Sequence, residues 1–160
     1  MGKSTWMLRV AAGSLVAMVL GATVASSVGA KSAGRADSGV VYLAVTHTVG
    51  DKQFAAGNSQ DKLFGTGSVT YVNIAKSTPS GTINVTTKPV VLYYKTGTMT
   101  GTATSKLTVG QNGAATITDG KLTAAKGTGG QKGHSVSVTF TGVGSITTQT
   151  YKITYKGTYR

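Results

Sequence analysis

The stretch that decides the fold is HSVSVTFTG, residues 134–142, in which apolar and polar side chains alternate. Val136, Val138 and Phe140 lie two positions apart, and serine or threonine separates them. A period of two places one set of side chains on each face of a β-strand. TYKITYKGTY, residues 150–159, alternates in the same way. Both stretches predict antiparallel strands with one buried face and one solvated face.

The same period predicts strands along most of residues 39–159. The other candidates are GVVYLAVTHT (39–48), LFGTGSVTYVNIA (63–75), SGTINVTT (80–87), KPVVLYYKT (88–96), TMTGTATSKLTV (98–109) and ATITDGKLTA (115–124). Pro89 marks a junction between two of them, because proline cannot donate to a strand ladder. Asn112 and Gly113 favour a hairpin turn with positive φ between two others.

Glycine recurs inside these candidate strands, where it costs stability unless the strand bends. The positions are Gly65, Gly67, Gly101, Gly142, Gly144 and Gly157. Repeated bends let a sheet curl and close, which removes exposed strand edges. We therefore expect an all-β fold over residues 39–160, a single antiparallel β-barrel of seven to eight strands. A β-sandwich is the alternative.

Two segments lack the alternating pattern. GDKQFAAGNSQDK, residues 50–62, is the longest irregular stretch between candidate strands, and we interpret it as a loop that holds either a short helix or a mobile flap. Residues 31–38 are small and polar, which predicts a flexible tether before the barrel.

The first 30 residues have the layout of a secretory signal peptide. Lys3 and Arg9 precede an apolar run over residues 10–24, and small residues follow it. We expect cleavage after Ala30, with Ala25 as the second choice, and a secreted, extracellular product. The apolar run is too short for a membrane span, and no later run is continuously apolar.

The chain is basic, with 16 Lys and Arg against four Asp and Glu. Without Lys3 and Arg9 the balance is 14 against four, a net charge of +10. Such an excess favours acidic cell-envelope polymers as partners. The lysines are scattered, so we expect no specific nucleic-acid partner. Lys126 precedes the glycine-rich stretch GTGGQKG (127–133), and Lys132 lies within it. The stretch fits no phosphate-loop motif, and we interpret it as a strand connection with a cationic edge.

Catalytic motifs are missing from the sequence, which has no cysteine, no glutamate and two histidines. We expect no enzymatic activity, no cofactor and no metal site. His47 shares a predicted face with the apolar residues of its strand, so it is either a hydrogen-bonded interior or rim residue or a polar group in a ligand cavity. The candidates for a cavity wall are His47, Asp51, Tyr71 and Tyr93.

Several segments resemble exported bacterial proteins of the allene oxide cyclase and dirigent-type barrel superfamily. They are FGTGSVTY (64–71), GTMTGTATSKLTV (97–109), GKLTAAKGTGGQKGH (120–134) and YKITYKGTY (151–159). The resemblance implies an eight-stranded antiparallel barrel, often oligomeric, with an apolar cavity that in plant members guides cyclisation or radical coupling. Plant dirigent members also use acidic cavity residues, and the resemblance assigns that role to none of the four aspartates.

These observations lead to one functional expectation and two alternatives. The sequence predicts a secreted, non-enzymatic barrel that binds an apolar or amphipathic small molecule or associates with the acidic cell envelope. The first alternative is a dirigent-like or cyclase-like barrel that guides a reactive substrate by the shape of its cavity. The second is a structural protein that coats the cell or its matrix.

Overall fold

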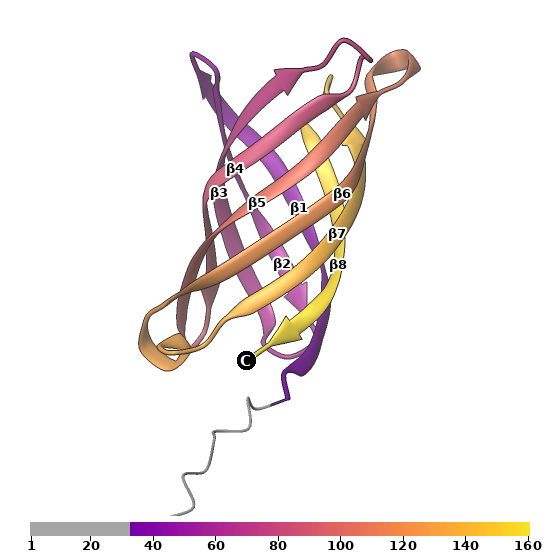
Figure 1. The fold of residues 1–160 in the computed structure, drawn as a ribbon. Coiled ribbons are helices and arrows are strands. Elements are labelled where there is room, and N and C mark those ends of the chain that lie inside the picture. Colours follow the sequence, from indigo (N-terminus) through magenta and orange to yellow (C-terminus); the bar gives the residue numbers. More distant parts are fainter. Residues whose placement is uncertain (1–32) are drawn as a thin grey trace, which may run out of the picture. The chain divides into compact units, whose positions relative to one another are not determined.

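The computed structural model describes residues 33–160, which form a closed barrel of eight antiparallel strands (Figure 1). The strands are β1 (Arg35–Val49), β2 (Lys52–Asp61), β3 (Gly65–Ser77), β4 (Ile83–Tyr94), β5 (Gly97–Val109), β6 (Ala114–Gly127), β7 (Val136–Ser145) and β8 (Thr150–Tyr159). Two short 3-10 helices, η1 (Gln111–Gly113) and η2 (Gly129–Gln131), lie in the connections. The all-β prediction and the barrel are confirmed, and the sandwich is excluded. The predicted signal peptide and its cleavage at Ala30 lie outside the described residues.

Each strand pairs with its neighbours in sequence, and β8 closes the barrel on β1. The closing ladder runs from Arg35 opposite Tyr159 to Ala44 opposite Thr150. No strand edge remains open, which protects a strand-rich protein from edge-to-edge association. Among residues 33–160, no helix is long and apolar enough to cross a membrane.

Alternation along the strands builds the core as the sequence predicts. Val136 and Val138 are buried and the serine between them is exposed. A central cluster of buried apolar residues lines the inner face, made of Val41, Val69, Val90, Ala103 and Ile153. Since these residues come from five different strands, the core is distributed around the barrel wall.

The prediction of a loop over residues 50–62 is wrong. Lys52–Asp61 forms β2, which joins β1 through a tight turn containing Gly50 at φ +59°. The inward-facing residues of this strand are small or polar, such as Ala55 and Ser59. They give no apolar alternation, and pairing with β1 and β3 forms the strand instead.

Two further boundaries differ from the prediction. The tether over residues 31–38 is wrong from Arg35 onward, because Arg35 to Ser38 pair with β8. The two strands predicted on either side of Pro89 form the single strand β4, whose pairing with β5 shifts between Thr87 and Val90. A bulge absorbs the missing donor, so the strand continues past the proline.

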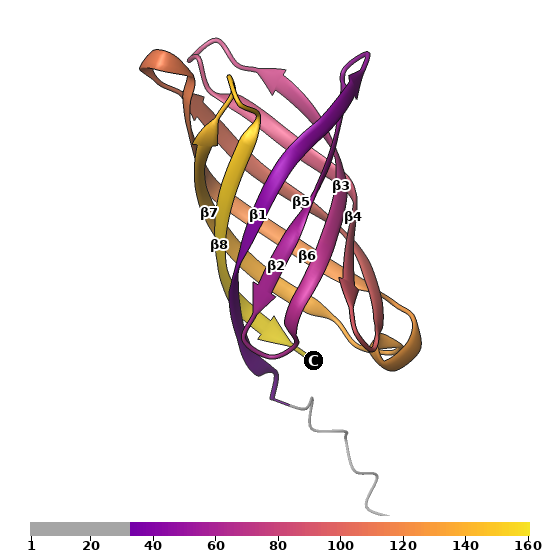
Figure 2. The ribbon, with the colours of Figure 1, turned by 180° about the vertical axis from the view of Figure 1, so that it is seen from behind.

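One end of the barrel is closed. The C-terminus and the β6–β7 connection lie at this end, opposite the β1–β2 turn (Figures 1 and 2). Met99 and Gln131 are almost completely buried there, with Tyr159 beside them. The Gln131 side chain donates to Thr96 Oγ1 at 2.8 Å and accepts from the Tyr159 hydroxyl at 3.1 Å. The glycine-rich stretch thus serves as a strand connection whose glutamine seals the barrel.

Candidate ligand-binding site

A cavity of about 370 Å³ occupies the barrel interior, and inward-facing residues from all eight strands line it. Its middle section is mainly aliphatic and aromatic, with Val41, Val69, Leu92, Phe140 and Ile153 among the wall residues. Concave, mostly apolar sites with few polar groups are typical of small-molecule binding. The walls therefore favour an apolar occupant.

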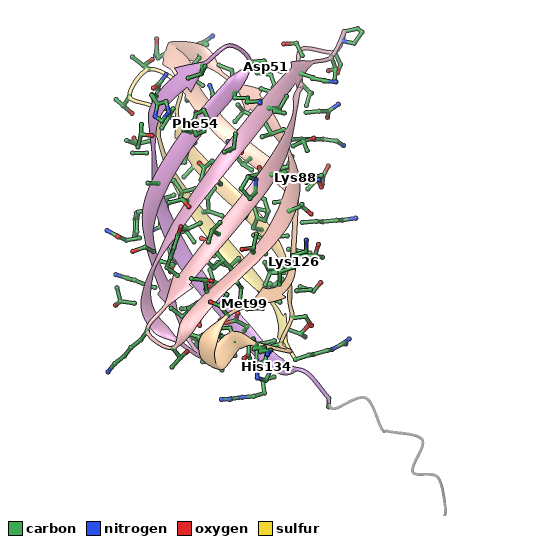
Figure 3. The ribbon with its side chains drawn as sticks, turned by 90° about the vertical axis from the view of Figure 1, so that its left-hand side faces the viewer. Asp51, Phe54, Lys88, Met99, Lys126 and His134 are labelled. Atoms are coloured by element: carbon green, nitrogen blue, oxygen red, sulfur yellow. The ribbon has the colours of Figure 1, made fainter. Side chains whose placement is uncertain are left out.

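The cavity opens at the end opposite the seal. Ile146 and Gln149, in the β7–β8 connection, line the cavity and are exposed to solvent. Asp51, in the turn between β1 and β2, lies at this same end, while Met99 lies inside the barrel near the other end (Figure 3). The apolar middle section therefore lies between the open end and the closed end.

Two aspartates lie toward the closed end. Asp37 of β1 and Asp61 of β2 are 3% and 6% exposed, respectively. Asp61 is directly opposite Gly39, and Asp37 precedes Gly39 by two residues on the same strand. Because side chains two apart in a strand share a face, both carboxyl groups belong to the inner face that carries Val41.

Asp61 is fully hydrogen-bonded. One carboxylate oxygen, Oδ1, accepts the backbone N–H groups of Leu63 at 2.7 Å and Phe64 at 2.8 Å. The other, Oδ2, accepts the Tyr155 hydroxyl at 2.6 Å. An aspartate that accepts the N–H groups of the next turn fixes that turn in place. Asp61 therefore has two roles: it fixes the turn that ends β2, and it holds the Tyr155 side chain of β8 in place.

Gly39 permits the contact between Tyr155 and Asp61. In the register of the sheet, Gly39 lies between these two residues, opposite Asp61 on one side and Tyr155 on the other. A Cβ at Gly39 would lie 2.5 Å from the Tyr155 hydroxyl oxygen. The absence of a side chain lets the phenol ring pass close to the strand, which is one use of glycine in sheets.

Asp37 differs from Asp61, because within the described chain neither of its carboxyl oxygens has a hydrogen-bond partner. Burial, and then the negative charge and the side-chain contact of Asp61, raise the pKa of Asp37 to about 6, while the backbone N–H of Ser38 acts in the opposite direction. Asp37 also lines the cavity. A buried, unpartnered polar group in a native structure requires an explanation.

Tyrosines near the two carboxyl groups stay protonated. Burial raises the pKa of both Tyr155 and Tyr94, and the charge of Asp61 raises both further. Tyr94 lines the cavity from β4. Both phenols therefore remain neutral hydrogen-bond donors across the physiological pH range.

A second polar group of side chains lies along the wall between β3 and β4. Thr87 Oγ1 donates to Asn73 Oδ1 at 2.6 Å, and both residues line the cavity. Tyr71, from β3, lies in the same wall, and burial raises the pKa of its hydroxyl. These groups add hydrogen-bonding positions within an otherwise apolar wall.

The structure brings one of the four proposed cavity residues into the wall, namely Tyr71. Tyr93 is a correction, because it is 42% exposed on the outer face while its neighbours Leu92 and Tyr94 point inward. The shift at Pro89 sets which of the two adjacent tyrosines faces the interior.

His47 and Asp51 are also corrections. The β1–β2 pairing shifts between Val45 and His47, so the inward alternation of β1 does not continue. His47 is exposed and stacks on Phe54, with ring centroids 4.4 Å apart. Asp51 is exposed in the adjoining turn and is not among the residues that line the cavity (Figure 3).

The proposed cationic loop lies on the exterior. Lys126 and Lys132 are both exposed and are absent from the residues that line the cavity. His134, two residues after Lys132 in the sequence, is stacked on Tyr159 with ring centroids 4.8 Å apart. Among residues 33–160, no three His or Asp side chains gather in a metal-binding arrangement.

Sequence reasoning missed the two aspartates, although a signal for each was present. Asp37 continues backward the alternation that places Val41 and Leu43 inside. Asp61 precedes a short turn, DKLF, in which an aspartate commonly accepts the following N–H groups. Neither signal was decisive, because both aspartates lie in segments interpreted as irregular.

The fold and the cavity together define a closed antiparallel β-barrel with an apolar interior and a buried acidic floor. Comparisons of the chain with protein-family models, with curated proteins and with solved structures found no match.

Proposed function

We propose that the protein binds an apolar or amphipathic small molecule inside the barrel. The observation that carries this proposal is the cavity of about 370 Å³, with apolar walls, one open end and one sealed end. Burial of apolar ligand surface is favourable by about 25 cal/mol per Å² before the costs of binding. The polar groups at the floor and on the β3–β4 wall provide orientation.

Native mass spectrometry of the protein purified from its own producing culture tests the proposal. We expect a reproducible excess mass that is released on mild denaturation. A protein that carries no added mass, and that also takes up no neutral apolar probe, contradicts the proposal.

A dirigent-like or cyclase-like activity is the second candidate. The placement of Asp37 favours it, since a protonatable carboxyl beside an apolar cavity can hold and polarise a reactive substrate. With this activity we also propose that the chain is a member of the allene oxide cyclase and dirigent-type barrel superfamily. Chiral analysis of coupling products from phenoxyl radicals tests it, and an unchanged racemic ratio in the presence of the protein contradicts it.

We also propose that the protein is exported and that its outer surface contacts acidic envelope polymers. Two of the four aspartates are buried, whereas every lysine and arginine of residues 33–160 is exposed. Of the two outer aspartates, Asp119 forms an ion pair with Lys106 at 2.9 Å. Co-sedimentation with isolated cell wall should weaken as salt rises, because salt screens exposed charges. Salt-independent or absent co-sedimentation contradicts this proposal.

A further inference from the structure

Asp37 is the most unusual group in the cavity. It is 3% exposed, lines the cavity and has no hydrogen-bond partner within the described chain. Asp61, whose three hydrogen bonds are all accounted for, lies beside it and increases the negative charge. The floor of the cavity thus holds an unpaired acid next to a paired one.

Among residues 33–160 no basic group forms an ion pair with Asp37, although Lys121 and Lys156 line a second pocket together with it. The titratable groups at this end of the cavity are Asp61 of β2, Tyr94 of β4, and Tyr155 and Tyr159 of β8. Within residues 33–160, no lysine, arginine or histidine lines the cavity. Arg35, two residues before Asp37 on β1, is exposed and forms no ion pair with either aspartate.

We propose that the ligand is an amphipathic cation, an apolar molecule with a terminal ammonium group that donates hydrogen bonds to the carboxylate of Asp37. This inference rests on the proposed function and names the chemical class of the occupant. The apolar body lies against the aliphatic middle of the barrel, and the ammonium group lies at the closed end.

Three ligand classes differ at this site for physical reasons. An ammonium group supplies both hydrogen-bond donors and the missing charge, and charge-assisted hydrogen bonds are about twice as strong as neutral ones. An alcohol supplies one neutral donor. A carboxylate adds a third acid to a buried pair, which like-charge repulsion and desolvation disfavour. Both protein carboxyl groups are already removed from water, so the cation needs to lose only its own hydration.

The pH dependence follows from the same groups. The pKa of Asp37 is raised to about 6, so its carboxyl is largely neutral at pH 5 and largely ionised at pH 7.5. An alkylammonium group stays charged throughout this range. Preference for the cation therefore increases as pH rises through 6.

Octylamine, octanol and octanoate test the inference, because they share one apolar chain and differ in one polar group. Isothermal titration calorimetry at pH 7.5 should rank octylamine tightest and octanoate weakest, with octylamine favoured over octanol by about tenfold or more. Asp37→Asn should reduce this ratio to near one while octanol affinity changes by less than about threefold. Asp51→Asn, at the exposed turn, is the matched control and should keep the wild-type ranking.

The outcomes separate this inference from the proposed function. Equal affinity for octylamine and octanol, or a preference for the amine that survives Asp37→Asn, overturns the cation inference and leaves cavity binding intact. Failure of all three compounds and of a neutral probe to bind overturns both. A preference for the amine that disappears at pH 5 and in Asp37→Asn supports the inference.

Discussion

The Tyr155 hydroxyl of β8, the last strand, donates a 2.6 Å hydrogen bond across β1 to Asp61 of β2. The two residues are 94 positions apart in sequence, and the bond exists only because β8 closes on β1 and β1 pairs with β2. This hydrogen bond depends on the closure of the barrel and lies at the floor of the cavity. Removing it should therefore affect both the stability of the barrel and the charge at the site.

Replacing Tyr155 with Phe removes this donor and leaves Asp61 with its two backbone N–H partners. A hydrogen bond to a charged group contributes about 1.5–3 kcal/mol, so we expect a loss of that order in the free energy of unfolding. Urea unfolding at pH 7.5 measures it. Tyr93→Phe, on the exposed face, is the control and should change stability by less than about 0.5 kcal/mol. Equal effects of the two substitutions would refute this role of Tyr155.

Gly39→Ala should destabilise the barrel through a steric clash. The new Cβ would lie 2.5 Å from the Tyr155 hydroxyl oxygen and closer still to the Gln60 carbonyl oxygen. Overpacking of this kind costs about 1–3 kcal/mol, and the strand backbone has little freedom to relax. Gly110→Ala is the matched control, because its nearest atom is 3.8 Å away and its φ of −94° suits any residue. Comparable melting temperatures for the two variants would contradict the packing described for Gly39.

Asp37→Asn should stabilise the protein at high pH. The pKa of Asp37 is about 6 in the folded protein against about 4 in an unfolded chain, so the folded protein loses stability as pH rises from about 4 to 6. The asparagine variant lacks this loss and should be more stable by about 1–3 kcal/mol at pH 8, with the difference vanishing near pH 3.5. Denaturant midpoints at several pH values test it. A variant that is less stable than wild type at pH 8 would show that the Asp37 carboxylate is paired.

The sequence predicts the barrel fold better than it predicts which segments form the individual strands. Strong alternation at residues 134–142 and 150–159 corresponds to β7 and β8, where large apolar residues alternate with threonine and lysine. β2 has no such alternation, because the inner positions it contributes hold small or polar side chains. Its identity as a strand depends on its pairing with β1 and β3, which the pattern within residues 52–61 does not encode.

The site was harder to predict than the fold for a related reason. A bulge reverses which face a side chain occupies, and the shifts near Thr46 and Pro89 moved His47 and Tyr93 away from the expected interior. Aspartate in a segment without apolar neighbours usually indicates a turn or loop. Asp37 becomes a cavity residue only through the β1–β8 ladder, and this long-range pairing is visible in the structure alone.

Cavity binding is tested most directly by titration with N-phenyl-1-naphthylamine, a neutral apolar fluorophore, using two matched tryptophan substitutions on β5. Ala103 is buried and lines the cavity, whereas Thr102 is exposed on the outer face. Both variants are first shown to be folded by circular dichroism. We predict saturable binding to wild type and to Thr102→Trp, and affinity at least about tenfold weaker for Ala103→Trp, because the indole fills the cavity. Absence of saturable binding to the wild-type protein, or equal binding by both variants, would contradict the barrel interior as a ligand site.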